Sequence, residues 1–325
     1  MSLEHLINQI KKNNFLLIGR AGIDIYPDPP GTKIENAEKF ISHLGGSSAN
    51  VAVELTKLGG HCNLLTRVSD DALGRLTLNQ LKRYNINTPL IKLEKNEARI
   101  SLAIVESRIK DHQSIIYRHH AADLYLSKED IVKAQIEKFA CILITGTAFA
   151  AEPSRSSLFM ALEIANKNNI PVIMDIDYRP YTWESQFIAK EIYNKASEKC
   201  SGIIGNDDEF AILSGDYSKG LNFAKNLSSI CDLVIYKKGE KGSITFTETN
   251  EIKKGIFSVK PIKPTGAGDA FMGALIGALL KNYDIKNSIE IGSAAAAIVV
   301  TKVGCAPAMP DLEQILEFIK NNNIN

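Results

Sequence analysis

The segment from Lys263 to Leu275 holds the residues whose types and order point most directly to chemistry. Gly266, Ala267 and Gly268 form a turn of small residues directly before a helical stretch, so their backbone N–H groups can converge on an anion at the helix N-terminus. Asp269 follows. A carboxylate there would repel a phosphate, unless it takes the proton from the hydroxyl that attacks that phosphate. The segment therefore predicts an anion hole and a general base in one turn.

The same segment has a plainer interpretation, in which a glycine-rich loop precedes a helix and Asp269 is the helix N-cap, a common use of aspartate. The sequence matches neither the P-loop pattern nor the dinucleotide-binding pattern GxGxxG. A nicotinamide oxidoreductase is disfavoured for the same reason, because the turn after the first predicted strand has Gly19 and Gly22 but no third glycine in register.

A second group of residues is suited to a ligand rich in hydroxyl groups. Gly45 and Gly46 would let such a ligand lie close to the backbone, and Asn50 offers both a donor and an acceptor. Asp24 follows the first predicted strand, where its carboxylate could accept hydrogen bonds from hydroxyls. A tight turn ahead of a helix, with Asp24 as a turn residue, explains the same pattern equally well.

Further charged side chains follow two later strands. Arg179 lies just past the strand 172–175, where it could hold a substrate carboxylate or stabilise a migrating phosphoryl group. Asn206 and Glu209 belong to an acidic run at the end of the next strand, and oxygen ligands of this kind suit Mg²⁺ held largely through water. The alternatives are a structural ion pair for Arg179 and a solvated acidic helix start for the second group.

These residues must be positioned by an alternation of short apolar strands and amphipathic helices. We expect one α/β domain over residues 1–325, with a Rossmann-type, mostly parallel sheet covered by helices on both faces. Two segments, about 24–41 and 98–120, break this rhythm and predict antiparallel strands outside the main sheet, forming a small lid over the carboxyl ends of the parallel strands. The strands are predicted at 15–19, 62–68, 141–145, 172–175, 202–204 and 233–236.

The composition disfavours several other classes of protein. Among 325 residues, 38 Lys and Arg balance 37 Asp and Glu, so we expect neither nucleic acid nor a membrane surface as a partner. The longest strongly apolar runs, 271–280 and 294–300, are far shorter than the roughly 18 residues of a bilayer span. Residues 2–13 predict an amphipathic helix and not a secretion signal, which favours a soluble, cytoplasmic protein. Five cysteines without a CxxC pair predict buried thiols and no structural zinc.

Taken together, these motifs resemble those of the ribokinase-like (PfkB-type) carbohydrate kinases over nearly the whole chain. The resemblance implies a Rossmann-like domain with a β-sheet lid, ATP and Mg²⁺ as cofactors, and phosphorylation of a sugar hydroxyl. It implies Asp269 as the base, Ala267 and Gly268 as anion-hole donors, Asp24 as a ligand of sugar hydroxyls, and Asn206 and Glu209 as the Mg²⁺ motif. The residues that it implies on the nucleotide side are Lys238, Gly239, Gly242, Thr265 and Ala295.

Within the family, several stretches resemble kinases that act on a keto-deoxy sugar acid. An anionic substrate gives Arg20, Arg118 and Arg179 a physical purpose that a neutral sugar would not, because a guanidinium matches a carboxylate. A neutral-sugar kinase and a non-catalytic binding regulator on the same fold are the alternatives. Lys263 stands where most members have an aspartate associated with a monovalent-cation site, and its ammonium could do part of the cation's electrostatic work. By family analogy, we also expect a homodimer formed through the lid.

Overall fold

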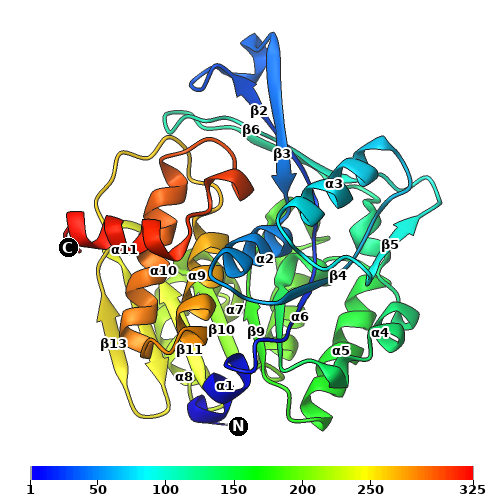
Figure 1. The fold of residues 1–325 in the computed structure, drawn as a ribbon. Coiled ribbons are helices and arrows are strands. Elements are labelled where there is room, and N and C mark those ends of the chain that lie inside the picture. The colour runs from blue at the N-terminus through cyan, green and yellow to red at the C-terminus, as the bar shows by residue number, and fades with distance from the viewer. Residues whose placement is uncertain (1, 325) are drawn as a thin grey trace.

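The computed structural model describes residues 2–324 and builds them around one large central sheet (Figure 1). Its strand order is β13-β12-β11-β10-β9-β8-β1-β4-β5. Neighbouring strands from β11 to β5 are parallel, and β12 and β13 add an antiparallel edge, which confirms the prediction of a mostly parallel sheet. The strands are β1 (Phe15–Ile18), β4 (Cys62–Ser69), β5 (Ile91–Glu94), β8 (Cys141–Thr145), β9 (Val172–Asp175), β10 (Gly202–Asn206), β11 (Leu233–Lys237), β12 (Ser243–Thr247) and β13 (Glu251–Lys254).

Helices cover both faces of this sheet because its strands are apolar on both sides. Along β1, Phe15 and Leu17 enter one hydrophobic core, whereas Leu16 and Ile18 enter the other. The first core is closed by α1 (Leu3–Ile10), α2 (Ser47–Lys57), α3 (Ala72–Arg83), α9 (Ala267–Leu280), α10 (Ile285–Val300) and α11 (Leu312–Asn321). The second is closed by α4 (Lys128–Ala134), α5 (Ser154–Lys167), α6 (Gln186–Ser197), α7 (Asp207–Ser214) and α8 (Gly220–Leu227).

A second sheet projects from one end of the body (Figure 1). Its order is β3-β2-β6-β7, with β2 (Gly22–Asp28), β3 (Lys39–Gly45), β6 (Ser101–Val105) and β7 (Ser114–Tyr117). The two segments predicted outside the main sheet supply these strands. The prediction that they are all antiparallel is wrong in one place, because β2 and β6 pair in parallel. The reason is topological: β6 is reached through the main sheet and not through a hairpin.

The two faces of this small sheet differ in burial. Asp24 and Tyr26 alternate on the inner face and are buried, and Tyr26 packs with residues of β6. The outer lid face, defined by Ile25, Phe40, Leu102, Ile104, Ile115 and Tyr117, is apolar and partly exposed. Phe40, Ile115 and Tyr117 are 44%, 42% and 58% exposed, so this face has no cover within the described chain.

Two further features bear on the sequence-based expectations. Among residues 2–324, no helix is both long and apolar enough to cross a membrane. All five cysteines are buried as free thiols.

Candidate active site

The N-terminus of α9 has the backbone geometry that the predicted anion-binding turn requires. Gly266 is the N-cap, with a φ of 85° that favours glycine, and no side chain caps this end of the helix. The first N–H groups of a helix have no partner within it, so those of the Gly266–Gly268 turn are available to a ligand. Asp269 lies in the first turn and is not the N-cap. The plainer interpretation of Asp269 is therefore wrong.

Asp269 is oriented by a side chain from another helix. Asn50 of α2 donates a hydrogen bond of 2.8 Å from Nδ2 to Oδ2 of Asp269, while Asn50 Oδ1 is buried without a partner. Burial, followed by the nearby carboxylate of Asp177, raises the pKa of Asp269 to about 7, although the bond from Asn50 opposes the shift. A carboxyl group with this pKa can accept a proton near neutral pH.

The distance between Asn50 and Asp269 depends on close contact between α2 and α9. A Cβ on Gly273 would lie 2.6 Å from Glu54 Cβ, and one on Gly277 would lie 2.6 Å from Leu58 Cβ. Both glycines are one or more helical turns from Asp269. They let the two helix backbones approach each other closely enough for the amide of Asn50 to reach the carboxylate.

Strand register places a further cation opposite the anion-binding turn. Lys237, the last residue of β11, pairs with Asn206 of β10, and its Nζ lies 3.9 Å from Asp175 Oδ1. A Cβ on Gly268 would lie 3.4 Å from the same Nζ, so this ammonium faces the turn. Burial works against its charge, but the carboxylates of Asp175 and Glu209 raise the pKa of Lys237 overall. Lys237 was not among the predicted site residues.

Arg179 is anchored beside the same strand ends. Its guanidinium forms an ion pair of 2.8 Å with Asp177 and is 45% exposed, so part of it is free to meet a ligand. Asp177 is buried, has an unusual positive φ of 41°, and accepts a hydrogen bond from Thr147. The Asp177 carboxylate raises the pKa of Arg179. The predicted structural ion pair exists, and it holds Arg179 at the edge of the site.

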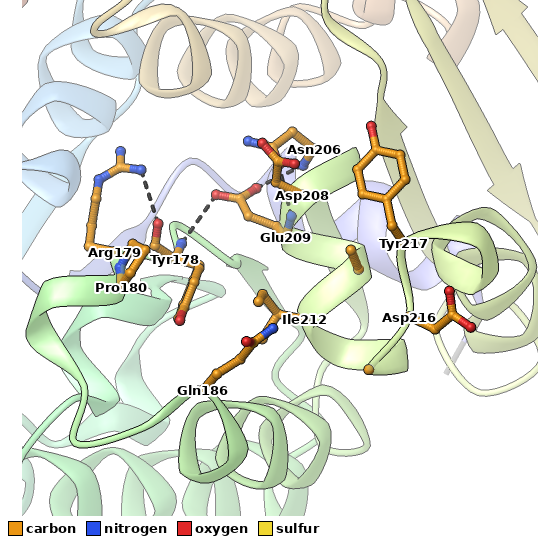
Figure 2. Close-up of a pocket in the computed structure, with 12 residues that line it drawn as sticks. Tyr178, Arg179, Pro180, Gln186, Asn206, Asp208, Glu209, Ile212, Asp216 and Tyr217 are labelled. Atoms are coloured by element: carbon orange, nitrogen blue, oxygen red, sulfur yellow. Dashed lines mark hydrogen bonds between the residues drawn. The ribbon is translucent and has the colours of Figure 1, made fainter.

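Asn206 and Glu209 form a capping box at the start of α7. Asn206 Oδ1 accepts from the Glu209 N–H at 2.9 Å, and Glu209 Oε2 accepts from the Asn206 N–H at 2.7 Å. The other oxygen of Glu209 accepts from the N–H of Tyr178 (Figure 2). Glu209 is only 5% exposed, and burial together with Asp175 raises its pKa to about 7. The predicted solvated helix start is therefore wrong for Glu209.

These residues fit a divalent cation only if water and phosphate supply most of its ligands. Among residues 2–324, no three His, Cys, Asp or Glu side chains are grouped so that they could hold a metal ion. The acids Asp175, Asp177, Glu209 and Asp269 nevertheless outnumber the cations Lys237 and Arg179 around the turn. Such an excess of oxygen ligands suits Mg²⁺, which usually keeps several waters and binds with substrate phosphates.

A cavity of about 480 Å³ opens beside this capping box, between α6 and α7 (Figure 2). Gln186 and Ile212 line it from the two helices, with Tyr217 at its rim. Neither Asp24 nor Asp269 lines it, so the cavity flanks the candidate metal motif and does not hold the acceptor site.

The predicted sugar-binding residues meet at the base of the lid. Asp24 in β2 is buried and accepts a hydrogen bond from Tyr26 at 3.3 Å, so it is not a turn residue. A Cβ on Gly45 would overlap the Asp24 carboxylate, and one on Gly46 would lie 2.6 Å from the carbonyl oxygen of Arg20. Both glycines are therefore needed for this approach of β2 and β3. Burial raises the pKa of Asp24, although the Arg20 guanidinium opposes the shift.

The three arginines proposed for an anionic substrate differ in how many of their N–H donors already have a partner in the protein. Arg118 is buried, and it donates to Asp123 from Nε at 3.0 Å and to the carbonyl of Thr147 at 2.9 Å. Arg20 is also buried, but it donates only to the Ser101 hydroxyl at 3.1 Å. Within residues 2–324, no carboxylate forms an ion pair with Arg20. Of these three arginines, Arg20 is thus the one with the most unused donors.

The residues predicted on the nucleotide side are spread over three elements. Lys238, Gly239 and Gly242 form the turn between β11 and β12, closed by a hydrogen bond of 2.7 Å from the Lys238 N–H to Gly242. Thr265 precedes α9, and its Oγ1 is buried without a hydrogen-bond partner. Ala295 is fully buried inside α10 and offers no surface to a ligand in this structure.

Comparison with known proteins agrees with this fold. Residues 12–312 match the model of the pfkB family of carbohydrate kinases, and the chain belongs to that family. It is 36% identical over 317 residues to a protein of Geobacillus thermodenitrificans named 5-dehydro-2-deoxygluconokinase. The aligned region covers 96% of this chain and 94% of the relative. The prediction of a carbohydrate kinase is confirmed.

Solved structures share the fold at lower identity. A fructokinase of Vibrio cholerae bound to fructose, ADP and potassium superposes with a TM-score of 0.84 at 24% identity, over 94% of this chain and 98% of that one. A structure from Escherichia coli described as a ribokinase II with ATP and Mg²⁺ gives a TM-score of 0.85 at 19% identity, over 95% and 99%. The predicted ribokinase-like architecture is confirmed.

Proposed function

We propose that this kinase transfers the γ-phosphate of ATP to the 6-hydroxyl of 5-dehydro-2-deoxy-D-gluconate, a step of myo-inositol catabolism in the cytoplasm. The observation that carries the transfer is Asp269, a carboxyl group with a pKa near neutrality, placed in the first turn of α9 beside unpaired N–H groups. The names of the relatives support the choice of acceptor. So does the incompletely paired guanidinium of Arg20 near Asp24.

The chemistry follows from the order of groups around the turn. The ionised Asp269 takes the proton of the acceptor hydroxyl, whose oxygen then bonds to the γ-phosphorus. The bond between that phosphorus and the oxygen of the β-phosphate breaks, and ADP leaves with the electron pair. Asn50 holds the Asp269 carboxylate by its Oδ2 throughout.

Charge that develops on the transferring group meets donors that are already in place. The N–H groups of the Gly266–Gly268 turn face it, with Lys237 on one side and the free part of Arg179 on another. A divalent cation bound with the phosphates near Asn206 and Glu209 would neutralise further charge. Preorganised donors of this kind need no rearrangement at the moment of transfer.

The substrate lies between the lid and the strand ends in this proposal. Asp24 accepts hydrogen bonds from sugar hydroxyls, and the backbone at Gly45 and Gly46 lets the carbon chain approach closely. Arg20 binds the carboxylate of the sugar acid through its unused N–H groups. Arg118 holds the site in place indirectly. It donates a hydrogen bond to the carbonyl of Thr147, and the hydroxyl of Thr147 donates to Asp177.

The test is a panel of acceptors in an assay that couples ADP release to NADH oxidation. We expect 5-dehydro-2-deoxygluconate to give the highest kcat/KM, followed by 2-dehydro-3-deoxygluconate, with fructose and ribose far lower. Turnover of a neutral sugar alone would overturn the choice of acceptor. ATP binding without turnover of any acceptor would instead favour the non-catalytic regulator.

The outer lid face supports a further part of the proposal, a homodimer formed through the lid. This face is apolar, and about half of the surface of Phe40, Ile115 and Tyr117 on it is exposed. Light scattering should give twice the chain mass of 35.7 kDa. Tyr117→Lys should shift the measured mass toward that of the monomer. A wild-type protein that is monomeric at micromolar concentration would contradict the dimer.

A further inference from the structure

Lys263 is a lysine with no access to solvent. Its side chain has 0% exposure and is among the largest fully buried side chains of the protein. The N–H groups of Ile262 and Lys263 both donate to the carbonyl oxygen of Val300, at 2.8 and 3.3 Å, which anchors this segment to the end of α10. The side chain then reaches forward, and Nζ donates a hydrogen bond of 2.6 Å to the carbonyl oxygen of Thr265.

That hydrogen bond fixes the orientation of the peptide that opens the anion-binding turn. A trans peptide is planar, and its C=O and N–H point in opposite directions. Because the Thr265 carbonyl is directed at the Lys263 ammonium, the N–H of Gly266 in the same peptide is directed away from it. Gly266 has positive φ and no side chain to hold it, so little else determines this orientation.

The charge on Lys263 has no direct counter-ion. Within the described chain, no carboxylate lies in ion-pair distance of its Nζ. The titratable groups that act on it are the thiol of Cys305 and, without an ion pair, the carboxyl groups of Asp269 and Asp24. Cys305 also packs against the turn, since a Cβ on Gly266 would lie 2.8 Å from its Sγ. Burying an ammonium in this way is unfavourable. An apolar side chain of the same length would fill the space at a lower cost, so packing does not explain the lysine.

We propose that Lys263 is a positioning residue for phosphoryl transfer, a built-in cation that holds the Thr265–Gly266 peptide with its N–H toward the anion site. The inference rests on the proposed role of the Gly266–Gly268 turn as the anion hole. The ammonium does not touch the substrate, and it acts through the peptide and through its field at Asp269 and Asp24. The wild-type enzyme accordingly needs no added potassium or other small cation in this turn.

The test compares Lys263→Met, which keeps the volume, with Lys263→Ala, which leaves an ammonium-sized space. We expect Lys263→Met to lower kcat about 10- to 100-fold with less than a threefold change in KM for ATP, since misaimed anion-hole donors act mainly on the transition state. The kcat of Lys263→Ala should be at least tenfold higher in methylammonium chloride or potassium chloride than in tetramethylammonium chloride. The wild-type rate should be the same in all three salts.

Lys190 offers a matched control, because its Nζ also donates to a backbone carbonyl, that of Ser214 at 3.1 Å, outside the transfer site. Lys190→Met and Lys190→Ala should keep kcat and show no response to amines. Thermal melting of each variant reports loss of folding separately from loss of rate. A folded Lys263→Met with wild-type kcat would overturn the proposal, and so would a folded, slow Lys263→Ala that neither cation restores.

Failure of the proposed function is distinguishable from failure of this inference. The wild-type acceptor panel alone decides which sugar is phosphorylated. The ratio of variant to wild-type rate is measured on whichever acceptor is turned over, so the role of Lys263 is tested even if the preferred acceptor is a neutral sugar.

Discussion

The amide of Asn50 donates a hydrogen bond to the carboxylate of Asp269 across the contact between α2 and α9. The two residues are far apart in the sequence and belong to the two glycine-containing motifs, one suited to hydroxyl groups and the other to phosphate. The bond therefore joins the acceptor side of the site to the transfer side. It also opposes the burial that raises the pKa of Asp269.

Asp269→Asn should remove the base while keeping the shape of the turn. We expect kcat to fall by at least roughly 10² to 10⁴, the usual contribution of general-base catalysis, with ATP affinity changed less than threefold. Coupled kinetics and calorimetric ATP titration measure the two quantities. Asp284→Asn, at the exposed N-cap of α10 and past the C-terminal end of α9, serves as the control. Near-wild-type turnover in Asp269→Asn would show that another group takes the proton.

The rate should depend on pH through the ionisation of Asp269. Its pKa is raised from 3.8 to about 7, and the base works only when deprotonated, so kcat should rise tenfold per pH unit below about 7 and level off above it. Asn50→Leu removes a hydrogen bond that lowers this pKa. The midpoint of its pH–rate profile should therefore lie at higher pH than in the wild type. An unchanged midpoint would show that Asn50 does not act on the group whose ionisation sets the rate.

Arg20→Met should weaken binding of an acidic acceptor. A charge-assisted hydrogen bond to a carboxylate contributes about 1.5–3 kcal/mol, so KM for the sugar acid should rise roughly 10- to 100-fold. KM for any neutral sugar that is turned over should change little. The exposed Arg99 provides a control, because Arg99→Met removes an arginine close to the lid without touching the site. Equal losses for acidic and neutral acceptors would argue against a carboxylate at Arg20.

Gly45→Ala should damage the sugar site more than the fold. The added methyl group would overlap the Asp24 carboxylate, which must then turn away from the substrate. We expect at least a tenfold rise in KM for the sugar. Gly202→Ala at the start of β10 is the comparison, since its new methyl would meet Ile173 at 3.2 Å, inside the core. There we expect a lower melting temperature with unchanged KM.

Arg67 supports the fold at a distance from the site. Its buried guanidinium donates to Asp130 at 2.7 Å and to Glu94 at 2.5 Å, and both acids are buried too. Arg67→Met removes the buried cation between these two carboxylates and leaves them only weaker partners, such as Ser127 for Asp130 and Asn96 for Glu94. This loss should cost about 3–5 kcal/mol of unfolding free energy in urea. Lys133→Met breaks an exposed pair with Glu129 and should leave the urea midpoint almost unchanged.

The sequence was most informative where function depends on backbone position. Residues that directly follow a buried parallel strand must meet at the carboxyl edge of the sheet, so Arg179 and Asn206 could be placed near each other from the order of strands alone. Lys237 was missed because the predicted strand ended at Tyr236, which left the lysine in a turn. The extra residue in β11 points its side chain at Asp175.

Side-chain pairing was the part that the sequence could not settle. Arg118, Arg20 and Arg179 are equivalent as sequence letters. Only the structure shows that Asp123 pairs with Arg118, whereas Arg20 forms no ion pair within residues 2–324. Parallel pairing of β2 with β6 likewise depends on the path of the intervening chain through the main sheet. Both features arise from long-range geometry and carry no local signal.

Gly273 and Gly277 give the interface between α2 and α9 an influence on catalysis, although neither glycine lies in the site. A single methyl group added at Gly273 would force the helices apart at Glu54, and the gap would be felt one turn away, where Asn50 reaches Asp269. Substitutions that do not contact the substrate can therefore weaken Asp269 as a base, because they change the distance between α2 and α9. Adjusting that spacing gives evolution or an engineer a way to change the rate without redesigning the pocket.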